Sequence, residues 1–309
     1  MSKQYRNMLL LIKIQPTPGV DSVPVVANAI LARGLKPSPL TAEFEKRNNV
    51  QAWMGNQGSV FTACHSELEF EVEFQSSGTA GTAPAYDALL RACALSSTNI
   101  VSTSQTYQPV TTALEAVSIY VHIDGVRYNM LDCKGSVAFS LNSRGIPVMR
   151  FKFLGLQVAP TDTAVPGGAV YTGFIAPLAI NFVNTPVFTL HAIAVKAKSL
   201  EIDLGNEVAY RNIVGSETVV LVDRNPTGTV VMELDTVAVK DWTAAIKAGT
   251  LAAIAFTHGL VAGNIMTIAC PKVQILDFSL DESDGITMVT AKLDIQPNAG
   301  NDEFVLVAR

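Results

Sequence analysis

Basic residues, cysteine, histidine and long hydrophobic runs are all scarce in this sequence of 309 residues. Charged residues make up 16% of it, and 27 acids against 22 bases give a formal net charge of −5. General affinity for nucleic acid requires clustered Lys and Arg that displace counterions from phosphates. The composition therefore argues against nucleic-acid binding, and any contact with DNA is expected to be passive or repulsive.

Cysteine and histidine each occur four times. The cysteines stand far apart with no Cys-x-x-Cys pair, which argues against a zinc site and against a dense disulfide framework. We expect reduced thiols that fill apolar space. No histidine has another histidine or a cysteine three or four positions away on an expected helix, so structural histidines are expected. These residues are Cys64, Cys93, Cys133, Cys270, His65, His122, His191 and His258.

Catalytic and cofactor motifs are also missing. The sequence contains no Gly-x-Ser-x-Gly, no phosphate-binding loop and no dinucleotide-binding glycine pattern. Asp281, Glu282 and Asp284 stand in a turn too short to wrap a calcium ion. We therefore predict no enzyme, no cofactor and no metal. The remaining enzyme alternative is a hydrolase that uses surface carboxylates, and it would require a cleft that the sequence does not indicate.

The longest apolar run near the N-terminus is Met8–Ile12. Lys13 interrupts it, and Pro16 follows without a small-residue cleavage site, so neither a signal peptide nor a membrane span is expected. A folded N-terminal strand fits better. At 49% hydrophobic residues, the chain can supply the cores of two ordinary domains.

The clearest pattern present is a β-hairpin that the sequence contains twice. From Met130 to Leu156, apolar and polar residues alternate on both sides of a polar turn that includes Gly145. A similar arrangement runs from Ile265 to Ile295 with a turn at Gly285. Both segments are predicted to be hairpins with one buried face.

A second strong pattern is the strand predicted over residues 67–74. Its apolar residues fall on one face, and Glu67, Glu69, Glu71 and Glu73 fall on the other. Neighbouring carboxylates about 7 Å apart repel by about 0.6 kcal/mol in water. Burying each large apolar partner returns about 1.5 to 3 kcal/mol, so the strand survives. The acidic face is either an ordinary solvated surface or one whose role depends on its negative charge.

The same order of elements then recurs: strand, hairpin, strand, helix, strand, hairpin. In the first copy the opening strand is predicted at residues 40–45, and a helix of about three turns begins near Pro84. In the second, residues 200–204 match the opening strand, a hairpin turns at residues 223–228, and a helix covers residues 242–251. This order predicts an internal duplication.

The expected organisation has four parts. Residues 1–35 form an N-terminal arm, in which residues 23–35 are either a short helix or extended. The first domain covers 36–157, a proline-rich connector covers 158–195, and the second domain covers 196–309. The connector is expected to pack on other parts of the protein, because its apolar side chains would be costly to leave in water: Phe174, Ile175, Ile180, Phe182, Val187, Phe188 and Leu190.

Read in this way, the sequence resembles the major tail tube proteins of long-tailed, siphovirus-type bacteriophages. The resemblance covers most of residues 20–160, and the second copy is recognised mainly through its similarity to the first. It is carried by residues 40–49, the 67–74 strand, the Ser77–Tyr86 stretch leading into residues 89–93, and residues 123–125 through Cys133-Lys134-Gly135.

The resemblance implies a mainly β (α+β) fold of two tandem tail-tube-type β-sandwich or barrel domains, each flanked by one α-helix. It implies a structural virion protein, made in the host cytoplasm, that forms stacked rings of a non-contractile tail tube and conducts the DNA genome during ejection. Two copies per chain favour homotrimeric rings with pseudo-sixfold symmetry, with a hexamer as the alternative. The implied partners are the chain itself, a tape-measure protein in the lumen and a tail terminator; DNA passes without specific binding, and no membrane is involved.

Under this interpretation the acidic strand faces would line the lumen. The proposed lumen-facing acids are Glu69, Glu71, Glu73, Glu233 and Asp235, and the competing candidates are Glu43, Glu45, Glu201 and Asp203. Screening limits their field to roughly 8 Å at physiological salt, so they would act as a thin repulsive lining. A head-to-tail connector or an adhesin built of tandem β-domains is the alternative function.

Overall fold

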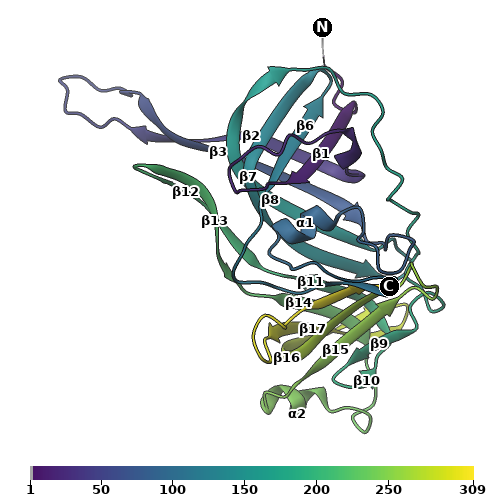
Figure 1. The fold of residues 1–309 in the computed structure, drawn as a ribbon. Coiled ribbons are helices and arrows are strands. Elements are labelled where there is room, and N and C mark those ends of the chain that lie inside the picture. The colour runs from purple at the N-terminus through teal and green to yellow at the C-terminus, as the bar shows by residue number, and fades with distance from the viewer. Residues whose placement is uncertain (1–2) are drawn as a thin grey trace.

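The computed structural model describes residues 3–309 and shows a mainly β protein with one large antiparallel sheet (Figure 1). The first half of the chain contains β1 (Met8–Ile14), a 3-10 turn η1 (Val26–Asn28), β2 (Ala32–Lys46), β3 (Ser59–Glu73), α1 (Asp87–Ala92), β4 (Thr98–Ile100), β5 (Ser104–Tyr107), β6 (Val117–Ile123), β7 (Val126–Asn142) and β8 (Val148–Asp162).

The second half contains β9 (Val187–Leu190), β10 (Ile193–Ala194), β11 (Ala197–Asp203), β12 (Asn206–Ile213), β13 (Ser216–Arg224), β14 (Thr227–Glu233), α2 (Trp242–Lys247), β15 (Leu251–His258), β16 (Met266–Ser283), β17 (Ile286–Gln296) and β18 (Val305–Ala308). Within residues 3–309, no helix is long and apolar enough to cross a membrane.

Both predicted hairpins are confirmed. β7 pairs with β8 and β16 pairs with β17, each as an antiparallel pair. The N-terminal strand is confirmed as well: β1 pairs with β6 along its full length, from Met8 opposite Ile123 to Ile14 opposite Val117. Asp124 and Gly125 both have positive φ, which suits the tight turn between β6 and β7.

The opening strand begins earlier than predicted. β2 starts at Ala32, so residues 23–35 are neither a full helix nor a fully extended arm but a 3-10 turn followed by the first residues of β2. The pairing of β2 with β3 also corrects which residues of the two halves correspond to each other. Lys36 lies opposite Glu69, as Glu201 lies opposite Thr229, so residues 200–204 correspond to a segment that begins near Leu35 rather than at Leu40.

The predicted hairpin turn at residues 223–228 is wrong. β13 and β14 do not pair with each other; β13 pairs with β12, while β14 pairs with β11 and β17. The two strands instead form one limb of a long hairpin that kinks at Pro226, which has no N–H to donate to a ladder. The opposite limb kinks at Gly205, where φ is +60°, and the true turn lies at Gly215.

Both helices are shorter than predicted, at six residues each. The first ends because Ala94 takes a left-handed φ of +58°, after which Leu95 bridges to Pro109. Before the helix, the N–H of Asp87 donates to the carbonyl of Pro84, so residues 84–86 form a turn. Tertiary contacts of the flanking chain thus override the helical periodicity.

The strand order repeats between the halves. The main sheet runs β2-β3-β8-β7 and continues as β11-β14-β17-β16 before reaching β15 and β9. The junction is formed by β7 and β11, which pair over residues 138–142 and 199–203. β18 adds a second link, because it pairs with β16 in its own half and with β5 in the other. One sheet therefore passes through both halves, and the domain boundaries at 36, 158 and 196 stay a prediction.

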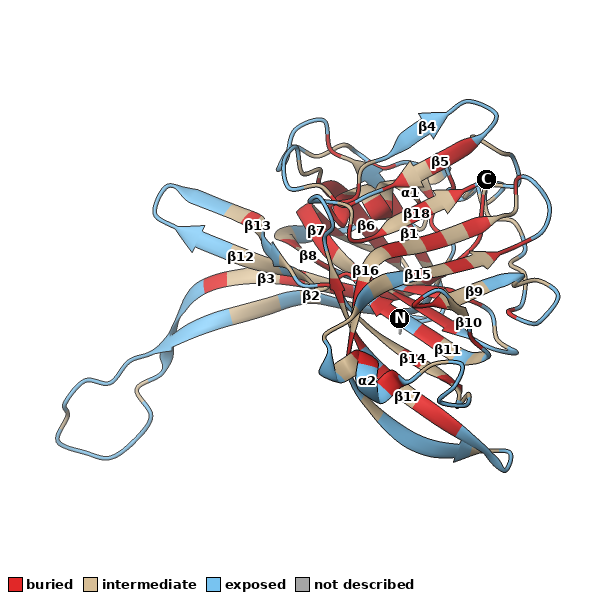
Figure 2. Ribbon diagram, turned by 90° about the horizontal axis from the view of Figure 1, so that it is seen from below, coloured by how far each residue is buried: buried red, intermediate tan, exposed pale blue. Residues whose placement is uncertain are grey.

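The core lies on one side of this sheet, and exposure rises along the projecting hairpins (Figure 2). Its centre includes stacked aromatic rings, such as Phe70 with Phe151 at 5.6 Å between centroids and Phe139 with Phe304 at 5.1 Å. The connector packs on its own chain: Ile180 and Leu190 are buried, and Tyr171 lies on a smaller cluster around β1 and β6. The expectation was wrong for Phe182, which is 97% exposed, and for Val187, which is also exposed.

Candidate functional site

His191 and His258 each bind backbone or side-chain groups of neighbouring segments. Nε2 of His258 lies 3.1 Å from the carbonyl of Leu178, and Nδ1 lies 3.0 Å from the hydroxyl of Thr185, so this ring holds the connector against β15. Nε2 of His191 lies 2.9 Å from the carbonyl of Val273. Burial lowers the pKa of both rings. Among residues 3–309, no group of three His, Cys, Asp or Glu side chains is arranged to hold a metal.

The candidate functional surface is the solvent face of the main sheet, which lies opposite the core. Glu69, Glu71 and Glu73 of β3 lie on it, while Leu68, Phe70 and Val72 point into the core and are at most 2% exposed. The predicted alternation of this strand is therefore confirmed. Because β8, β7, β11, β14 and β17 continue the same sheet, alternate residues of each extend this solvent face across both halves.

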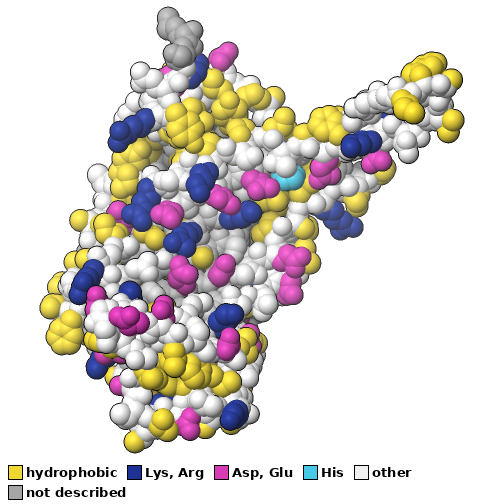
Figure 3. All heavy atoms as spheres, turned by 180° about the vertical axis from the view of Figure 1, so that it is seen from behind, with side chains coloured by type: hydrophobic (Ala, Val, Ile, Leu, Met, Phe, Trp, Pro, Cys, Tyr) yellow, Lys and Arg dark blue, Asp and Glu magenta, His cyan; other side chains and the backbone are white. Residues whose placement is uncertain are grey.

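This face is not uniformly acidic, because basic side chains stand between the carboxylates (Figure 3). The two oxygens of Glu71 are bound from both sides, by Nε of Arg33 at 3.0 Å and by Nε of Arg150 at 3.3 Å. Nζ of Lys152 lies 3.7 Å from Glu69. The repulsion expected along the strand is thus offset by cations on its neighbours. Each exposed pair contributes only about 0–1 kcal/mol.

Two acids from the competing set lie on this same face. The guanidinium of Arg150 reaches Glu201 at 3.2 Å as well as Glu71, and so links β3 to β11 across the junction of the halves. The hydroxyl of Ser140 donates to Glu201 at 3.2 Å, and Asp203 lies 3.4 Å from the hydroxyl of Ser136. In the second half, the proposed and the competing lumen-facing acids therefore do not exclude each other.

The other predicted acids lie in different parts of the structure. Glu233 lies at the end of β14, 3.0 Å from Nζ of Lys196, while Asp235 lies beyond the strand in the following loop. Glu43 and Glu45 lie on the outer part of β2, exposed on the hairpin that projects from the body (Figure 1). The structure thus brings Glu69, Glu71, Glu73, Glu201, Asp203 and Glu233 onto one face and leaves Asp235, Glu43 and Glu45 apart from it.

Charge on the solvent face is concentrated in the first half. Through the pairing of β14 with β17, Thr229 and Val231 occupy the places that Glu69 and Glu71 hold on β3, and Thr290 occupies that of Arg150. Lys292 keeps the place of Lys152. The repeated strands therefore share geometry more than charge.

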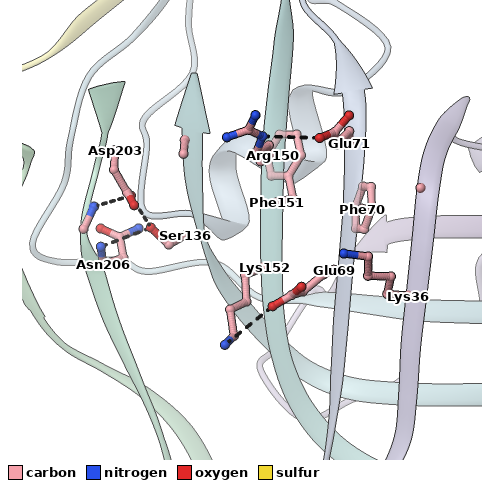
Figure 4. Close-up of a pocket in the computed structure, with 13 residues that line it drawn as sticks. Lys36, Glu69, Phe70, Glu71, Ser136, Arg150, Phe151, Lys152, Asp203 and Asn206 are labelled. Atoms are coloured by element: carbon pink, nitrogen blue, oxygen red, sulfur yellow. Dashed lines mark hydrogen bonds and ion pairs between the residues drawn. The ribbon is translucent and has the colours of Figure 1, made fainter. Parts of the chain in front are cut away.

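A shallow depression crosses the solvent face where the halves meet (Figure 4). Its lining includes the charged residues Lys36, Glu69, Arg150, Lys152 and Asp203 and the small residues Gly34, Ala138 and Gly205. It is open to solvent, and its charged side chains pair mainly with one another. This arrangement suits contact with a large, smooth partner better than enclosure of a small molecule.

The sequence alone did not reveal two long free edges that the main sheet has among residues 3–309. One is β2, whose single partner among the described residues is β3. The other is the outer half of β16, residues 277–283, for which the described part of the chain supplies no neighbour except β17. In the first half the equivalent part of β7 is covered by β11, and Phe139 there is fully buried. Leu280, which occupies the same place on β16, is 60% exposed.

Two hairpins project from the body on the same side (Figure 2). The β2–β3 hairpin is the longer, and its tip carries exposed Val50, Trp53 and Met54. The β12–β13 hairpin ends at Val214, which is also exposed. Apolar side chains at the end of a long projection are unusual for an isolated protein and indicate contact with another surface.

Comparison with known proteins gives one family match. The family model described as phage tail tube protein matches residues 6–302, nearly the whole chain. No curated protein matches the chain.

Proposed function

Because the chain belongs to the phage tail tube protein family, and is therefore a structural component of the virion tail, we propose that it assembles into stacked rings whose lumen conducts the DNA genome. The observation that carries this proposal is the pair of free edges on one continuous sheet. An exposed sheet edge pairs readily with another strand, and two different edges of one sheet allow head-to-tail association that can close into a ring.

The solvent face of the main sheet is proposed as the lining of the lumen. Supporting this, the opposite face carries the hydrophobic core and so cannot face water. The paired charges around Glu71 and Arg150 would leave little net field beyond the Debye length of about 8 Å. DNA then meets a hydrated wall with acids in slight excess and few unpaired bases. Such a wall offers weak, nonspecific contact and little resistance to a moving duplex.

Three chains per ring are proposed, with pseudo-sixfold symmetry. The support is the repeated strand order: β2-β3-β8-β7 and β11-β14-β17-β16 follow one another around the sheet. If each half occupies a sixth of a ring, three chains close it, and this arrangement implies an internal duplication. A hexamer of whole chains is the alternative. A tape-measure protein in the lumen, a tail terminator and a non-contractile siphovirus-type tail are further proposals that rest on the family.

The test is negative-stain electron microscopy of the purified protein, combined with its mass in solution by light scattering. The proposal predicts tubes or rings, and a soluble assembly with a mass three times that of the 32.9 kDa chain. A protein that stays monomeric at high concentration and never forms rings would contradict it.

A further inference from the structure

We propose that the joint between neighbouring subunits copies the joint between the two halves of one chain. In this joint the outer half of β16 in one copy pairs with β2 of the next, and Lys36 lies against the partner copy's Asp281. This inference rests on the proposed ring assembly and adds to it the identity of both edges, their register and the side chains that select them. The template for it is the β7–β11 junction.

The hydrogen bonding of the template shows which side chains approach most closely. The N–H of Leu204 donates to the carbonyl of Val137, and the N–H of Ser143 donates to the carbonyl of Lys198. Hydrogen-bonded and non-hydrogen-bonded pairs alternate along an antiparallel ladder. Counting from these two hydrogen bonds, the pair of Glu201 with Ser140 and the pair of Asp203 with Ala138 are both non-hydrogen-bonded. Side chains are closest at such pairs, and the 3.2 Å bond between Ser140 and Glu201 shows this contact directly.

The register of the template can be applied to the free edges, because the two halves contain equivalent strands. Arg150 and Thr290 occupy equivalent places on β8 and β17, as do Glu71 and Val231 on β3 and β14. Working outward from these strands, Lys36 takes the place of Glu201 and Asp281 takes that of Ser140. Ser38 likewise takes the place of Asp203, and Ser279 that of Ala138.

The chemistry of the edges agrees with this register. The inner part of β2 carries Arg33 and Lys36, whereas the outer part of β16 carries Asp277, Asp281 and Glu282. Within residues 3–309, Lys36, Asp277 and Asp281 form no ion pair with another side chain. A basic edge and an acidic edge attract each other, and two like edges repel, so the pairing is head-to-tail.

Apolar surface is present on both edges as well. Leu276 and Leu280 of β16 are more than half exposed. Along the edge of β2 lies a depression whose lining includes Leu31, Leu35 and Tyr5, with Tyr5 64% exposed. Since Phe139 and Ile202 are fully or almost fully buried in the template, Leu280 is expected to become buried against Pro37 and its neighbours.

Prolines reduce the number of backbone hydrogen bonds that β2 can form at this joint, so side chains must determine which strand pairs with it. Pro37 takes the place of Ile202, which makes a hydrogen-bonded pair with Phe139 in the template, so its missing N–H faces the free edge. The carbonyl of Pro39 is already bound by the hydroxyl of Ser66 at 2.7 Å. Prolines on an edge strand prevent indiscriminate pairing. The ladder is therefore incomplete, and the charged and apolar contacts decide which strand binds.

The test is a charge exchange in the full chain. Lys36→Asp and Asp281→Lys, made singly, are expected to raise the concentration for half-maximal assembly by about tenfold or more, because each creates a like-charge contact. The double variant is expected to restore assembly. Glu45→Lys, on the projecting hairpin, is the matched control and is expected to assemble normally. Circular dichroism of each variant checks that it is folded.

A cysteine pair tests the register independently. In a Cys64→Ser background, Ser38→Cys with Ser279→Cys is expected to form a disulfide between subunits on oxidation, whereas Ser38→Cys with Ser283→Cys is expected not to. Single variants that assemble as wild type, or equal crosslinking of both pairs, would overturn the inference while wild-type tubes still support the proposed function. Failure of the wild-type protein to assemble would instead count against the proposed function itself.

Discussion

Lys134 and Asp132 form a buried ion pair with 2.5 Å between Nζ and Oδ1, and together they bind both backbone polar groups of Val219. Nζ of Lys134 donates to the carbonyl of Val219 at 2.7 Å, and the N–H of Val219 donates to Asp132 at 2.9 Å. Both charges belong to β7 in the first half, whereas Val219 belongs to β13 in the second. The pair therefore fastens the β12–β13 hairpin across the other half.

Breaking this pair is predicted to be costly. Lys134→Met leaves the Asp132 carboxylate buried without a cation, which destabilises by about 3 to 5 kcal/mol. Urea denaturation followed by tryptophan fluorescence measures the loss. The double variant Lys134→Met with Asp132→Leu removes both charges and is predicted to recover part of the stability. A single variant as stable as wild type would show that the pair does not hold the hairpin.

Stability is predicted to fall as the pH drops below about 6.5. Burial lowers the pKa of His122, His191 and His258, so these rings bind protons less readily in the folded chain than in the unfolded chain. Folding is then disfavoured progressively at lower pH. Unfolding free energies measured between about pH 5 and 8 test this dependence. His258→Gln is predicted to flatten the curve, and an unchanged slope would contradict the role assigned to that ring.

The paired charges of the solvent face are predicted to matter little for folding. Arg150 is 52% exposed, and exposed ion pairs contribute about 0–1 kcal/mol each. Arg150→Gln should therefore shift the denaturation midpoint only slightly, in contrast to Lys134→Met measured in the same way. A loss as large as that of the buried pair would show that the junction of the halves depends on Arg150.

The lining is predicted to control DNA adhesion. Replacing Glu69, Glu71 and Glu73 by Lys would place unpaired cations on the proposed wall, and tubes of this variant should retain DNA at low salt and release it as salt rises. Wild-type tubes should not retain DNA. The control carries Glu43→Lys and Glu45→Lys on the projecting hairpin. Sedimentation of tubes with short duplex DNA measures retention, and equal retention by both variants would contradict the assignment of the face.

The tip of the β2–β3 hairpin is predicted to act between rings rather than within the fold. Trp53 is 72% exposed, so Trp53→Ser should leave the denaturation midpoint unchanged. The same change should reduce tube length, which electron microscopy measures, if the apolar tip seats on a neighbouring ring. Val214→Ser on the shorter hairpin provides the comparison. Tubes of normal length from the Trp53 variant would exclude this role for the tip.

The sequence predicted features that depend on local periodicity. Alternation identified β3, the β7–β8 hairpin and the β16–β17 hairpin, because one buried face imposes a period of two. Prediction from local periodicity was wrong where tertiary contacts determine the path of the chain. Pro226 within a polar stretch indicated a turn, yet the chain continues through it, because β11 and β17 bind β14 from both sides.

The candidate surface was predicted only in part. Repeating carboxylates on one strand are visible in the sequence, but their partners, Arg33 and Arg150, come from neighbouring strands whose pairing the sequence does not show. The same limit applies to the edges. Nothing local distinguishes Leu280 from its buried equivalent Phe139, because the difference lies in whether β11 or solvent is next to it.

The central claim is that three chains close a ring with the solvent face of the main sheet inside. A cryo-electron microscopy map of assembled tubes tests it most directly. The account predicts three chains per ring, six similar halves, Glu71 and Arg150 on the lumen, and the turns at Gly145 and Gly285 related by a rotation near sixty degrees. A map with these two side chains on the outer surface, or with six whole chains in each ring, would contradict it.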